Sequence, residues 1–553
     1  MRKISRVLAI VLAVAMMLTV LVACGGDSAG KTNPPSATNS PEGTNSPATA
    51  DPAEPQGEER TLVMAVVSDA GTLNPHTYGS PMYIQSMLYE GLTRYKNGEV
   101  IGGIAERWEI SEDGREYTFF LRPGNVFSDG TPVTAEVVKR NLDVILKHKD
   151  EHKWMESVNQ LSAIEVVDDS TVKVILDEPF SAVLQELALA RPLRIGANAI
   201  FPENGDSAEG IVEPIGSGMW KIKEHVEGQY AIFERNDNYW GEKPAFKYVE
   251  MRVIPDINTA SNAFKAGELD LIYDISGQMT GDTYNELTGS GFETIISNPI
   301  NTSNLLLNSA RGATAEINVR LALQHAVDKK MIAENIYYGI QTPADTLIPT
   351  DTPYCDVGLE PYDYDLEKAG ALLDEAGWIL GNGDKYRSRD GEELLIKFFY
   401  EGENESGKII GQFLQNEYQK IGVNVELVAQ DSQSYHNAQH EGLFDMMLTE
   451  SWGAPFDPHS YLSSFRNPSH GDYAAQVGLP MKAEIDAAVS KALNSTDEKE
   501  IQDSYEYVLR TLHDQAVYVP LTSTTRQAAF SAEITGIYFN TSSDIPFEDF
   551  GYR

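Results

Sequence analysis

Strand-like and helix-like patterns alternate from residue 61 to the end of this 553-residue chain, and this alternation is the strongest constraint on its fold. Strands are predicted at Thr61–Val67, Arg107–Ile110, Tyr117–Leu121, Val172–Leu176, Met219–Lys223, Tyr230–Phe233, Tyr248–Ile254, Leu394–Tyr400 and Val423–Leu427. Helices are predicted at Met82–Leu92, Ala135–His148 with Thr134 as N-cap, Ile257–Ala266, Val319–Tyr338, Asp365–Gly377 and Gly407–Ile421. This mixture fits an α/β protein with two lobes.

The first 23 residues have the pattern of a secretory signal peptide. Arg2, Lys3 and Arg6 precede an uncharged apolar run that continues to Ala23. The ending L-V-A-C-G resembles the lipobox of bacterial lipoproteins, which implies that Cys24 becomes the lipidated first residue of the mature protein. The alternative is an ordinary signal peptide followed by an incidental cysteine.

Residues 24–60 are expected to form a flexible tether. They are rich in Gly, Ser, Thr, Asn, Pro and Ala, and T-N-S-P occurs twice. Such a segment buries too little apolar area to offset its ordering entropy. It would hold the globular part away from the membrane.

Charge and cysteine content exclude several classes of partner. The chain has 43 Lys and Arg against 82 Asp and Glu, a formal net charge of −39, which disfavours nucleic acid and anionic membrane surfaces. Membrane contact is therefore expected only through the lipid anchor. With two cysteines in all and Cys24 acylated, no disulfide framework is possible, and Cys355 is expected to be packed in a core.

No catalytic motif emerges from the sequence. G-x-G-x-x-G, the Walker A pattern and H-E-x-x-H are absent. Gly216-Ser217-Gly218 lacks the spacing of a nucleophile elbow, so a tight turn is expected there. A secreted metallohydrolase would need clustered protein ligands and a general base, and no such cluster is visible. We therefore expect neither an enzyme nor a catalytic cofactor.

The stretch Trp452–Tyr473 carries the strongest sign of a ligand site. Its 22 residues include one Trp, two Phe, two Tyr, two His and three Pro. The prolines predict a stiff, irregular loop that holds side chains toward a cavity. Aromatic faces beside imidazoles suit a planar or metal-bearing small ligand. The alternative is a surface loop whose aromatic residues pack into the core.

Four segments resemble the peptide and nickel class of extracellular solute-binding proteins, which serve ABC importers. They are L-R-P-G-N-V-F-S-D-G-T-P-V-T-A (Leu121–Ala135), P-I-G-S-G-M-W (Pro214–Trp220), R-N-D-N-Y-W-G-E-K-P (Arg235–Pro244) and V-R-L-A-L-Q-H-A-V-D-K-K (Val319–Lys330). The resemblance implies a monomer with a periplasmic-binding-protein-like fold, in which two lobes hinge around a cleft. Residues 61–302 and 524–553 would form lobe I, and residues 303–523 would form lobe II.

Within that class, Trp452–Tyr473, His152–Trp154 and Glu186–Arg194 resemble the nickel-binding branch, in which nickel arrives inside a small organic chelator. The resemblance implies roles for six residues: His470 as the single metal ligand, Arg191 for the chelator's carboxylates, Trp154, Trp452 and Phe456 as aromatic walls, and Met82 in the pocket lining.

Two positions depart from the branch. Glu151 replaces a second arginine, and Phe456 replaces a tyrosine. Loss of a cation and gain of a carboxylate are expected to disfavour strongly anionic chelates. The hypothesis is therefore a neutral or weakly anionic complex, such as nickel with two histidines.

The main alternative is a peptide-binding protein of the same class. Its members place an aspartate three residues after the tryptophan to pair with the peptide's terminal amine, and Pro455 occupies that position here. Asp457 is the residue that could substitute, and a heme cargo also stays open. The remaining histidines carry weaker signals. The pairs His436/His440 and His148/His152 resemble solvated faces, His76 is undecided, and His459 is expected to be structural.

Overall fold

The computed structural model describes residues 59–96, 98–402, 404–468, 470–540 and 544–553. The predicted signal peptide, Cys24 and nearly all of the predicted tether lie outside the described residues. The described residues fall in one compact unit that extends to Arg553. Within them, no helix combines the length and apolar character that a membrane span requires.

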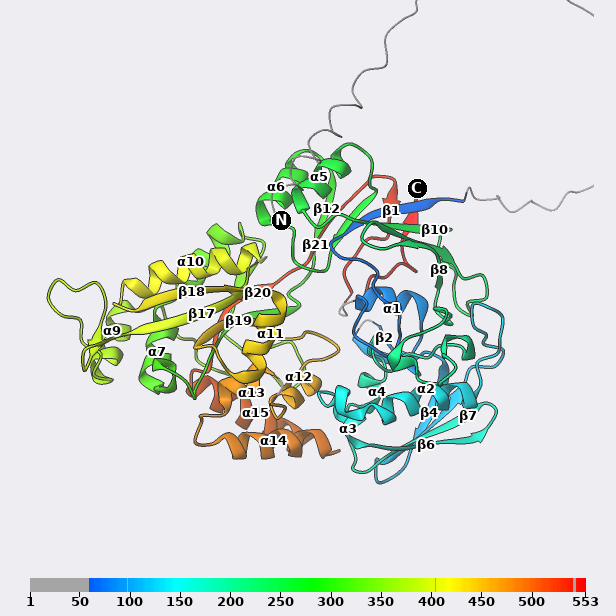
Figure 1. Ribbon diagram of the computed structural model, residues 1–553, viewed down its shortest axis with the longest axis horizontal. Helices are drawn as coiled ribbons and strands as arrows, with labels where there is room; N and C mark the ends of the chain where they lie inside the picture. The colour runs from blue at the N-terminus through cyan, green and yellow to red at the C-terminus, as the bar shows by residue number, and fades with distance from the viewer. Residues whose placement is uncertain (1–58, 97, 403, 469, 541–543) are drawn as a thin grey trace, which may run out of the picture. The chain divides into compact units, whose positions relative to one another are not determined.

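The largest sheet of the described structure has seven strands in the order β12-β21-β11-β1-β10-β9-β8 (Figure 1). Its strands are β1 (Thr61–Val66), β8 (Trp220–Val226), β9 (Tyr230–Arg235), β10 (Tyr248–Val253), β11 (Leu271–Asp274), β12 (Glu293–Ile296) and β21 (Gln527–Phe530). β1 lies inside the sheet and pairs in parallel with β10 and β11. Its apolar residues Leu62 and Met64 are fully buried, as expected for an interior strand.

A second sheet has six strands in the order β14-β20-β13-β19-β17-β18. Its strands are β13 (Asn301–Leu307), β14 (Thr342–Pro343), β17 (Leu395–Glu401), β18 (Asn424–Gln430), β19 (Met446–Glu450) and β20 (Tyr518–Thr524). An antiparallel four-stranded sheet, β4-β5-β7-β6, comprises β4 (Ala105–Ile110), β5 (Glu116–Leu121), β6 (Leu161–Asp168) and β7 (Thr171–Leu176). The two-stranded ribbons are β2 (Thr93–Lys96) with β3 (Glu99–Gly102), β15 (Ser388–Arg389) with β16 (Glu392–Glu393), and β22 (Ile534–Thr535) with β23 (Gly551–Tyr552).

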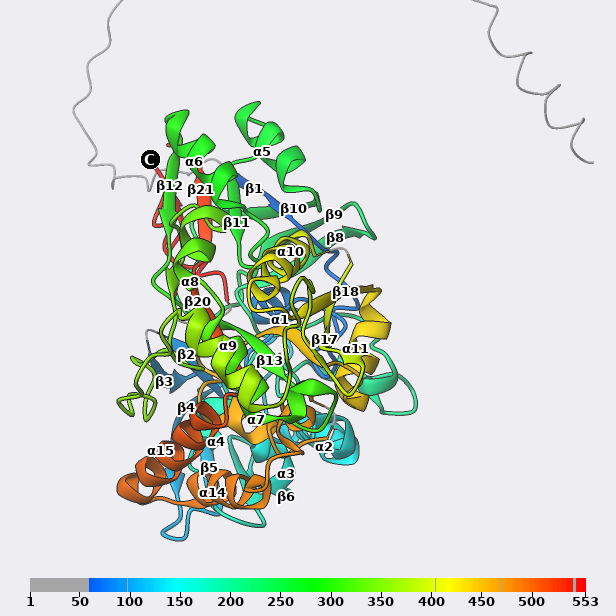
Figure 2. The ribbon, with the colours of Figure 1, turned by 90° about the vertical axis from the view of Figure 1, so that its left-hand side faces the viewer.

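Helices cover these sheets. They are α1 (Met82–Leu88), α2 (Ala135–Lys147), α3 (Glu156–Gln160), α4 (Val183–Glu186), α5 (Ile257–Lys265), α6 (Gly281–Gly289), α7 (Ile317–His325), α8 (Lys329–Met331), α9 (Leu366–Glu375), α10 (Glu405–Gln419), α11 (Ser432–Glu441), α12 (His459–Ser464), α13 (Gly471–Gln476), α14 (Lys482–Asn494) and α15 (Glu498–Asp514). In both Figure 1 and Figure 2, α5 and α6 lie at one end of the described structure and α14 and α15 at the opposite end. The predicted N-cap Thr134 of α2 accepts a hydrogen bond from a backbone N–H of the first turn. Asp365, with which the predicted helix begins, is the N-cap of α9 and accepts a similar bond.

The two large sheets are joined where the chain crosses twice between them. The first crossing runs from β12 to β13 and the second from β20 to β21. The crossings lie side by side, because Ile300 N–H donates to Thr524 O at 2.9 Å and Ser297 N–H donates to Arg526 O at 2.8 Å. The predicted two-lobed α/β fold is therefore confirmed. The lobe boundaries at residues 303 and 523 stay a prediction.

Three predicted elements differ from the structure. The helix predicted at Val319–Tyr338 is interrupted after His325, because Asp328 caps a new helix by accepting Met331 N–H at 3.0 Å. The helix predicted to reach Leu92 ends at Leu88. There the backbone of Gly218 donates to Leu88 O at 3.0 Å, and a Cβ on Gly216 would lie 1.9 Å from that same oxygen. Only glycine permits this close approach.

The stretch Trp452–Tyr473 is the third difference, because it is not irregular throughout. Helix α12 begins directly after Pro458, and α13 begins directly after His470. A proline before the first turn costs no hydrogen bond, since the first N–H groups of a helix have no partner within it. Among the described residues, the irregular parts of this stretch are Trp452–Pro458 and the connection between α12 and α13, which contains Pro468.

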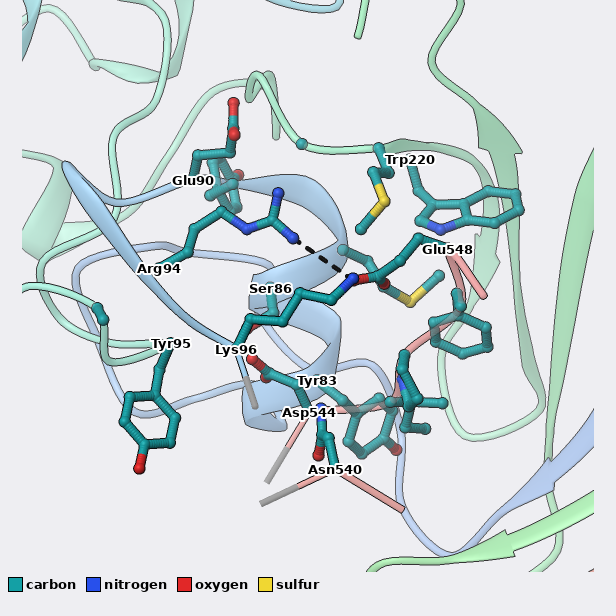
Figure 3. Close-up of a pocket in the computed structure, with 18 of the residues that line it drawn as sticks. Tyr83, Ser86, Glu90, Arg94, Tyr95, Lys96, Trp220, Asn540, Asp544 and Glu548 are labelled. Carbon is teal, nitrogen blue, oxygen red and sulfur yellow. Dashed lines mark hydrogen bonds and ion pairs between the residues drawn. The ribbon is translucent and has the colours of Figure 1, made fainter. Parts of the chain in front are cut away.

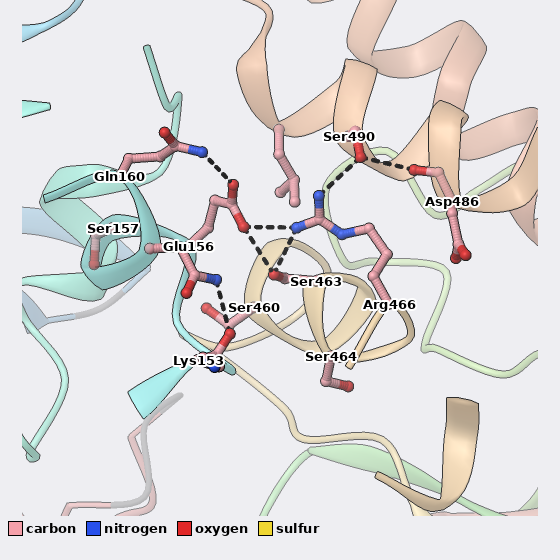
Figure 4. A network of polar contacts seen from close by, with 12 residues as sticks. Lys153, Glu156, Ser157, Gln160, Ser460, Ser463, Ser464, Arg466, Asp486 and Ser490 are labelled. Atoms are coloured by element: carbon pink, nitrogen blue, oxygen red, sulfur yellow. Dashed lines mark hydrogen bonds and ion pairs between the residues drawn. The ribbon is translucent and has the colours of Figure 1, made fainter. Parts of the chain in front are cut away.

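A buried polar network joins α3 and α4 to α12, and Figure 4 shows the part of it around Glu156 and Arg466. Arg466 Nη2 lies 2.6 Å from Glu156 Oε2, and Ser463 Oγ donates to the same oxygen at 3.4 Å. Glu186, which is 1% exposed, accepts hydrogen bonds from Ser157 N–H at 2.8 Å and from Ser460 Oγ at 2.9 Å. Because α12 lies between strands β19 and β20 of the six-stranded sheet and α3 lies between strands β5 and β6 of the four-stranded one, these contacts connect the two lobes.

Arg466→Met is expected to lower the free energy of unfolding by about 3–5 kcal/mol, because it leaves the buried Glu156 carboxylate without its cation. The measurement is urea unfolding followed by circular dichroism. The control is Arg115→Met, which removes an exposed pair with Glu178 and should cost less than about 1 kcal/mol. The double variant Glu156→Gln/Arg466→Met should recover most of this lost unfolding free energy. A loss equal to that of Arg466→Met alone would show that the unpaired Glu156 carboxylate is not its cause.

A pH dependence follows from Glu186. Burial raises its pKa to about 7, against the lowering effect of its hydrogen bonds. A raised pKa in the folded state adds stability below the ordinary value near 4.5, and this gain is lost as the pH rises through 7. Relative to Glu186→Gln, the native protein should therefore lose about 3 kcal/mol of unfolding free energy between pH 4.5 and 7.5. A difference between the two proteins that stays constant over that range would refute this expectation.

Candidate ligand-binding site

A cavity of about 620 Å³ lies between the two lobes and contains every residue predicted for the ligand site. Its lining includes Met82, Trp154 and Arg191 from lobe I and Trp452, Phe456 and His470 from lobe II. Met82 is the first residue of α1, Trp154 follows the short helical turn Lys149–His152, and Arg191 follows α4. The fold thus brings together six residues that are spread over 389 positions of the sequence, from Met82 to His470.

Aromatic rings from both lobes meet at one side of this cavity. The ring centroids of Trp154 and Trp452 are 5.7 Å apart with planes at 77°, an edge-to-face contact. Phe456 lies 6.3 Å from Trp154 and 6.0 Å from Trp452. His470 lies 5.8 Å from Trp452. These contacts make a continuous aromatic wall across the lobes.

Tyr78 supports this wall and was missed by sequence reasoning. Trp154 Nε1 donates to Tyr78 Oη at 2.7 Å, which fixes the indole ring. The same hydroxyl lies 2.7 Å from His152 Nδ1. Burial lowers the pKa of His152 to about 4, so the ring is neutral at pH 7 and can accept a hydrogen bond from the tyrosine hydroxyl. No local pattern could have revealed Tyr78, because it lies 76 positions before Trp154.

The guanidinium of Arg191 is positioned by backbone carbonyls. Its Nη1 donates to Tyr78 O at 3.1 Å and to Ser80 O at 2.7 Å, and its central carbon lies 5.3 Å from the Tyr78 ring centroid. Burial lowers the pKa of Arg191, although an arginine stays charged at neutral pH. In the described part of the chain it has no carboxylate partner. Its remaining N–H groups suit an anionic ligand group.

His470 supplies the imidazole of the cavity. It precedes the first turn of α13, and burial lowers its pKa to about 4, with a further contribution from His440. The ring is therefore neutral at pH 7, which is the form that binds metals. Among the described residues, no group of three or more His, Cys, Asp or Glu side chains is arranged to hold a metal ion. A metal in this cavity would take most of its ligands from another molecule.

Several other predicted positions do not line the cavity. Glu151 has a side chain that is 63% exposed and lies 3.0 Å from His148 Nδ1. Asp457 is buried and accepts hydrogen bonds from Trp452 N–H at 3.1 Å and Gly453 N–H at 2.8 Å, so its carboxylate holds the loop. His459 is also buried, with its Nδ1 2.7 Å from the hydroxyl of Tyr505.

The remaining histidines and Cys355 are structural or exposed. His76 is buried and contacts Ser207 Oγ at 2.7 Å. His436 is exposed on α11, and His440 belongs to the same helix. Cys355 is 2% exposed, and burial raises the pKa of its thiol, as expected for a packed cysteine.

Three charged residues line the cavity without having been predicted: Glu450, Arg526 and Asp544. Glu450 is the last residue of β19, and its Oε2 accepts a hydrogen bond from Asn301 Nδ2 at 3.1 Å. Arg526 lies in the crossing between β20 and β21. Glu450 stands two positions before Trp452, so a search around the aromatic stretch would have found it. Arg526 belongs to no recognisable motif.

A second cavity, of about 70 Å³, lies in lobe I beside α1 (Figure 3). Its charges are paired within the protein. Arg94 and Lys96 each lie 3.4 Å from Glu548 Oε1. Glu90 accepts hydrogen bonds from Trp240 Nε1 and Ser217 Oγ, both at 2.9 Å. The small volume and these pairings leave little room and few available polar groups for a ligand in this cavity.

Comparisons with known proteins agree with this geometry. Residues 99–473 match the family model described as bacterial extracellular solute-binding proteins, family 5. The chain is 40% identical to the nickel-binding periplasmic protein of Escherichia coli, over 87% of this chain and 92% of the relative. It is 26% identical to the probable D,D-dipeptide-binding periplasmic protein of the same organism, over 87% and 91%.

Among solved structures, NikA from Brucella suis in complex with Fe(III)-EDTA superposes with a TM-score of 0.87 at 43% identity. The alignment covers 89% of this chain and 100% of that chain. The fold, the cavity between the lobes and the matched length lead to one conclusion. This chain belongs to the bacterial extracellular solute-binding proteins of family 5.

Proposed function

We propose that this protein captures a nickel ion inside a small organic chelator and delivers it to the membrane permease of an ABC importer. The observation that carries the proposal is a single cavity lined by a neutral imidazole, a guanidinium without a carboxylate partner among the described residues, and aromatic rings from both lobes. A relative named for nickel and a similar structure that holds a chelated metal support it.

His470 is the proposed metal ligand. A neutral imidazole binds a borderline metal such as nickel(II) well. One protein ligand is too few to hold a bare ion, so the chelator must fill the other coordination positions. Weak attachment to the protein also leaves a complex that can dissociate for transport.

Arg191 and the aromatic wall would bind the chelator itself. The planar guanidinium presents paired N–H donors that match a carboxylate. Trp154, Trp452 and Phe456 would cover the apolar parts of the chelate, and Met82 would complete the lining. Nickel is thus the transported cargo, and the protein acts as a binding protein rather than an enzyme.

We assign residues 61–302 with 524–553 to lobe I and residues 303–523 to lobe II. Because the cavity takes side chains from both, a bound ligand would stabilise the closed arrangement of the lobes. The mature monomer would be attached through Cys24 to the outer face of the bacterial cell membrane. Residues 24–60 would then set the distance from the membrane to the lobes.

The deciding experiment is elemental analysis combined with mass spectrometry of the ligand that co-purifies with the protein. We expect nickel together with a small chelator. A metal-free peptide would overturn the proposal in favour of peptide transport. That alternative has less support in the structure, because the Asp457 carboxylate is occupied by backbone N–H groups.

His470→Ala is expected to weaken the binding of nickel with L-histidine by roughly hundredfold or more, because it removes the proposed metal ligand. Isothermal titration calorimetry measures the change. The control is His436→Ala, which alters an exposed histidine on α11 and should leave the affinity unchanged. Unchanged nickel affinity in His470→Ala would remove His470 from its proposed role.

Arg191→Gln is expected to weaken the same complex by about tenfold to hundredfold, the effect of losing one charged hydrogen-bond partner. The matched control is Arg115→Gln, which removes an exposed guanidinium paired with Glu178. Equal affinities for the two variants would show that Arg191 does not contact the chelator.

A further inference from the structure

The cavity holds a second guanidinium, that of Arg526, in a place fixed by the fold. Arg526 belongs to the crossing between β20 and β21. Its N–H donates to Ser297 Oγ at 2.8 Å, and its carbonyl accepts from Ser297 N–H at 2.8 Å. The backbone of Arg526 is therefore anchored on both sides, at the point where the two crossings lie side by side.

The side chain of Arg526 extends along the segment after β11, which also lines the cavity. Its Nη1 lies 3.5 Å from the position that a Cβ on Gly277 would take, which places the guanidinium beside this segment. The carboxylate of Asp274 interacts electrostatically with this guanidinium. Burial raises the pKa of Asp274, and backbone N–H groups and Arg526 oppose that shift.

Asp274 does not form an ion pair with Arg526, because its oxygens are used elsewhere. They accept hydrogen bonds from Met279 N–H at 2.5 Å and Ser276 N–H at 3.2 Å. In the described part of the chain, the guanidinium of Arg526 has no hydrogen-bond or ion-pair partner. A half-buried guanidinium that donates no hydrogen bond to the described residues has N–H groups available for an anionic group of a ligand.

Arg191 and Arg526 therefore share one property: each lines the cavity and has no carboxylate partner among the described residues. The lining of the cavity also contains two carboxylates, those of Glu450 and Asp544. Two guanidinium groups and two carboxylates sum to a formal charge of zero. Such a cavity matches a ligand that is neutral overall and yet carries separate carboxylates.

We infer that Arg526 is a specificity-determining residue that binds the second carboxylate of the chelate. The ligand class is nickel(II) with two amino-acid chelators, one carboxylate of which contacts Arg191 and the other Arg526. This inference rests on the proposed function. Arg526 would supply the second cation that the sequence lacks at Glu151, whose side chain lies outside the cavity lining.

The test is calorimetry with two nickel complexes, those of L-histidine and of histamine. Histamine keeps the imidazole and the amine of histidine and lacks the carboxylate. Arg526→Gln should weaken the histidine complex by about tenfold to hundredfold and change the histamine complex by less than about threefold. Arg526→Lys should lose part of the histidine affinity, because an ammonium group lacks the bidentate fork.

The matched control is Arg107→Gln in β4, where the exposed guanidinium pairs with Glu109, and both affinities should be unchanged. An unchanged thermal midpoint of Arg526→Gln would show that the variant folds normally. Equal losses for the two complexes, or no loss for either, would overturn the assignment of Arg526. If the native protein binds neither complex, the proposed nickel function fails, and the role of Arg526 fails with it.

Discussion

The two lobes are held together covalently only at the paired crossings of the chain, and the rest of the molecule depends on that arrangement. Ile300 and Ser297 on the first crossing are hydrogen-bonded to Thr524 and Arg526 on the second. All other contacts between the lobes in the described structure are non-covalent, including the aromatic wall and the pair of Glu156 and Arg466. A ligand in the cavity therefore contributes directly to the balance between open and closed lobes.

The cavity combines groups that protein interiors normally keep apart. Two guanidinium groups lie in it without carboxylate partners among the described residues, and a neutral imidazole lies against indole rings. Such groups cost desolvation energy when they stay unmatched, and a metal chelate supplies complementary partners for all of them. Carboxylate oxygens suit the guanidinium groups, an open coordination position suits the imidazole, and carbon atoms suit the aromatic wall.

Residues behind the cavity surface determine how rigid this arrangement is. Tyr78 is the main example, because its hydroxyl orients Trp154 while its carbonyl and ring hold Arg191. Asp457 has a similar role, since its carboxylate fixes the turn between Trp452 and Phe456. A ligand site whose donors are already oriented loses less entropy when the ligand binds.

Most of the helices and strands that local sequence patterns predicted are present in the structure. Strand β1 and helix α2 agree with their expected bounds to within one residue at each end, because their periodicity and capping residues are local signals. The errors have tertiary causes. Helix α1 stops early because the backbone of Gly216 and Gly218 packs against its last turn, a contact between segments that are more than a hundred residues apart.

The sequence by itself determined the α/β class, the aromatic stretch and, through family resemblance, the six residues that meet in the cavity. Only the tertiary structure decided which other groups join them. Arg526 and Tyr78 belong to no motif and reach the cavity because two chain crossings and a buried histidine place them there. Glu151 occupies the position of a second arginine in the aligned pattern, and its side chain lies outside the cavity lining. Side-chain direction depends on packing between distant segments, and that information is absent from short-range patterns.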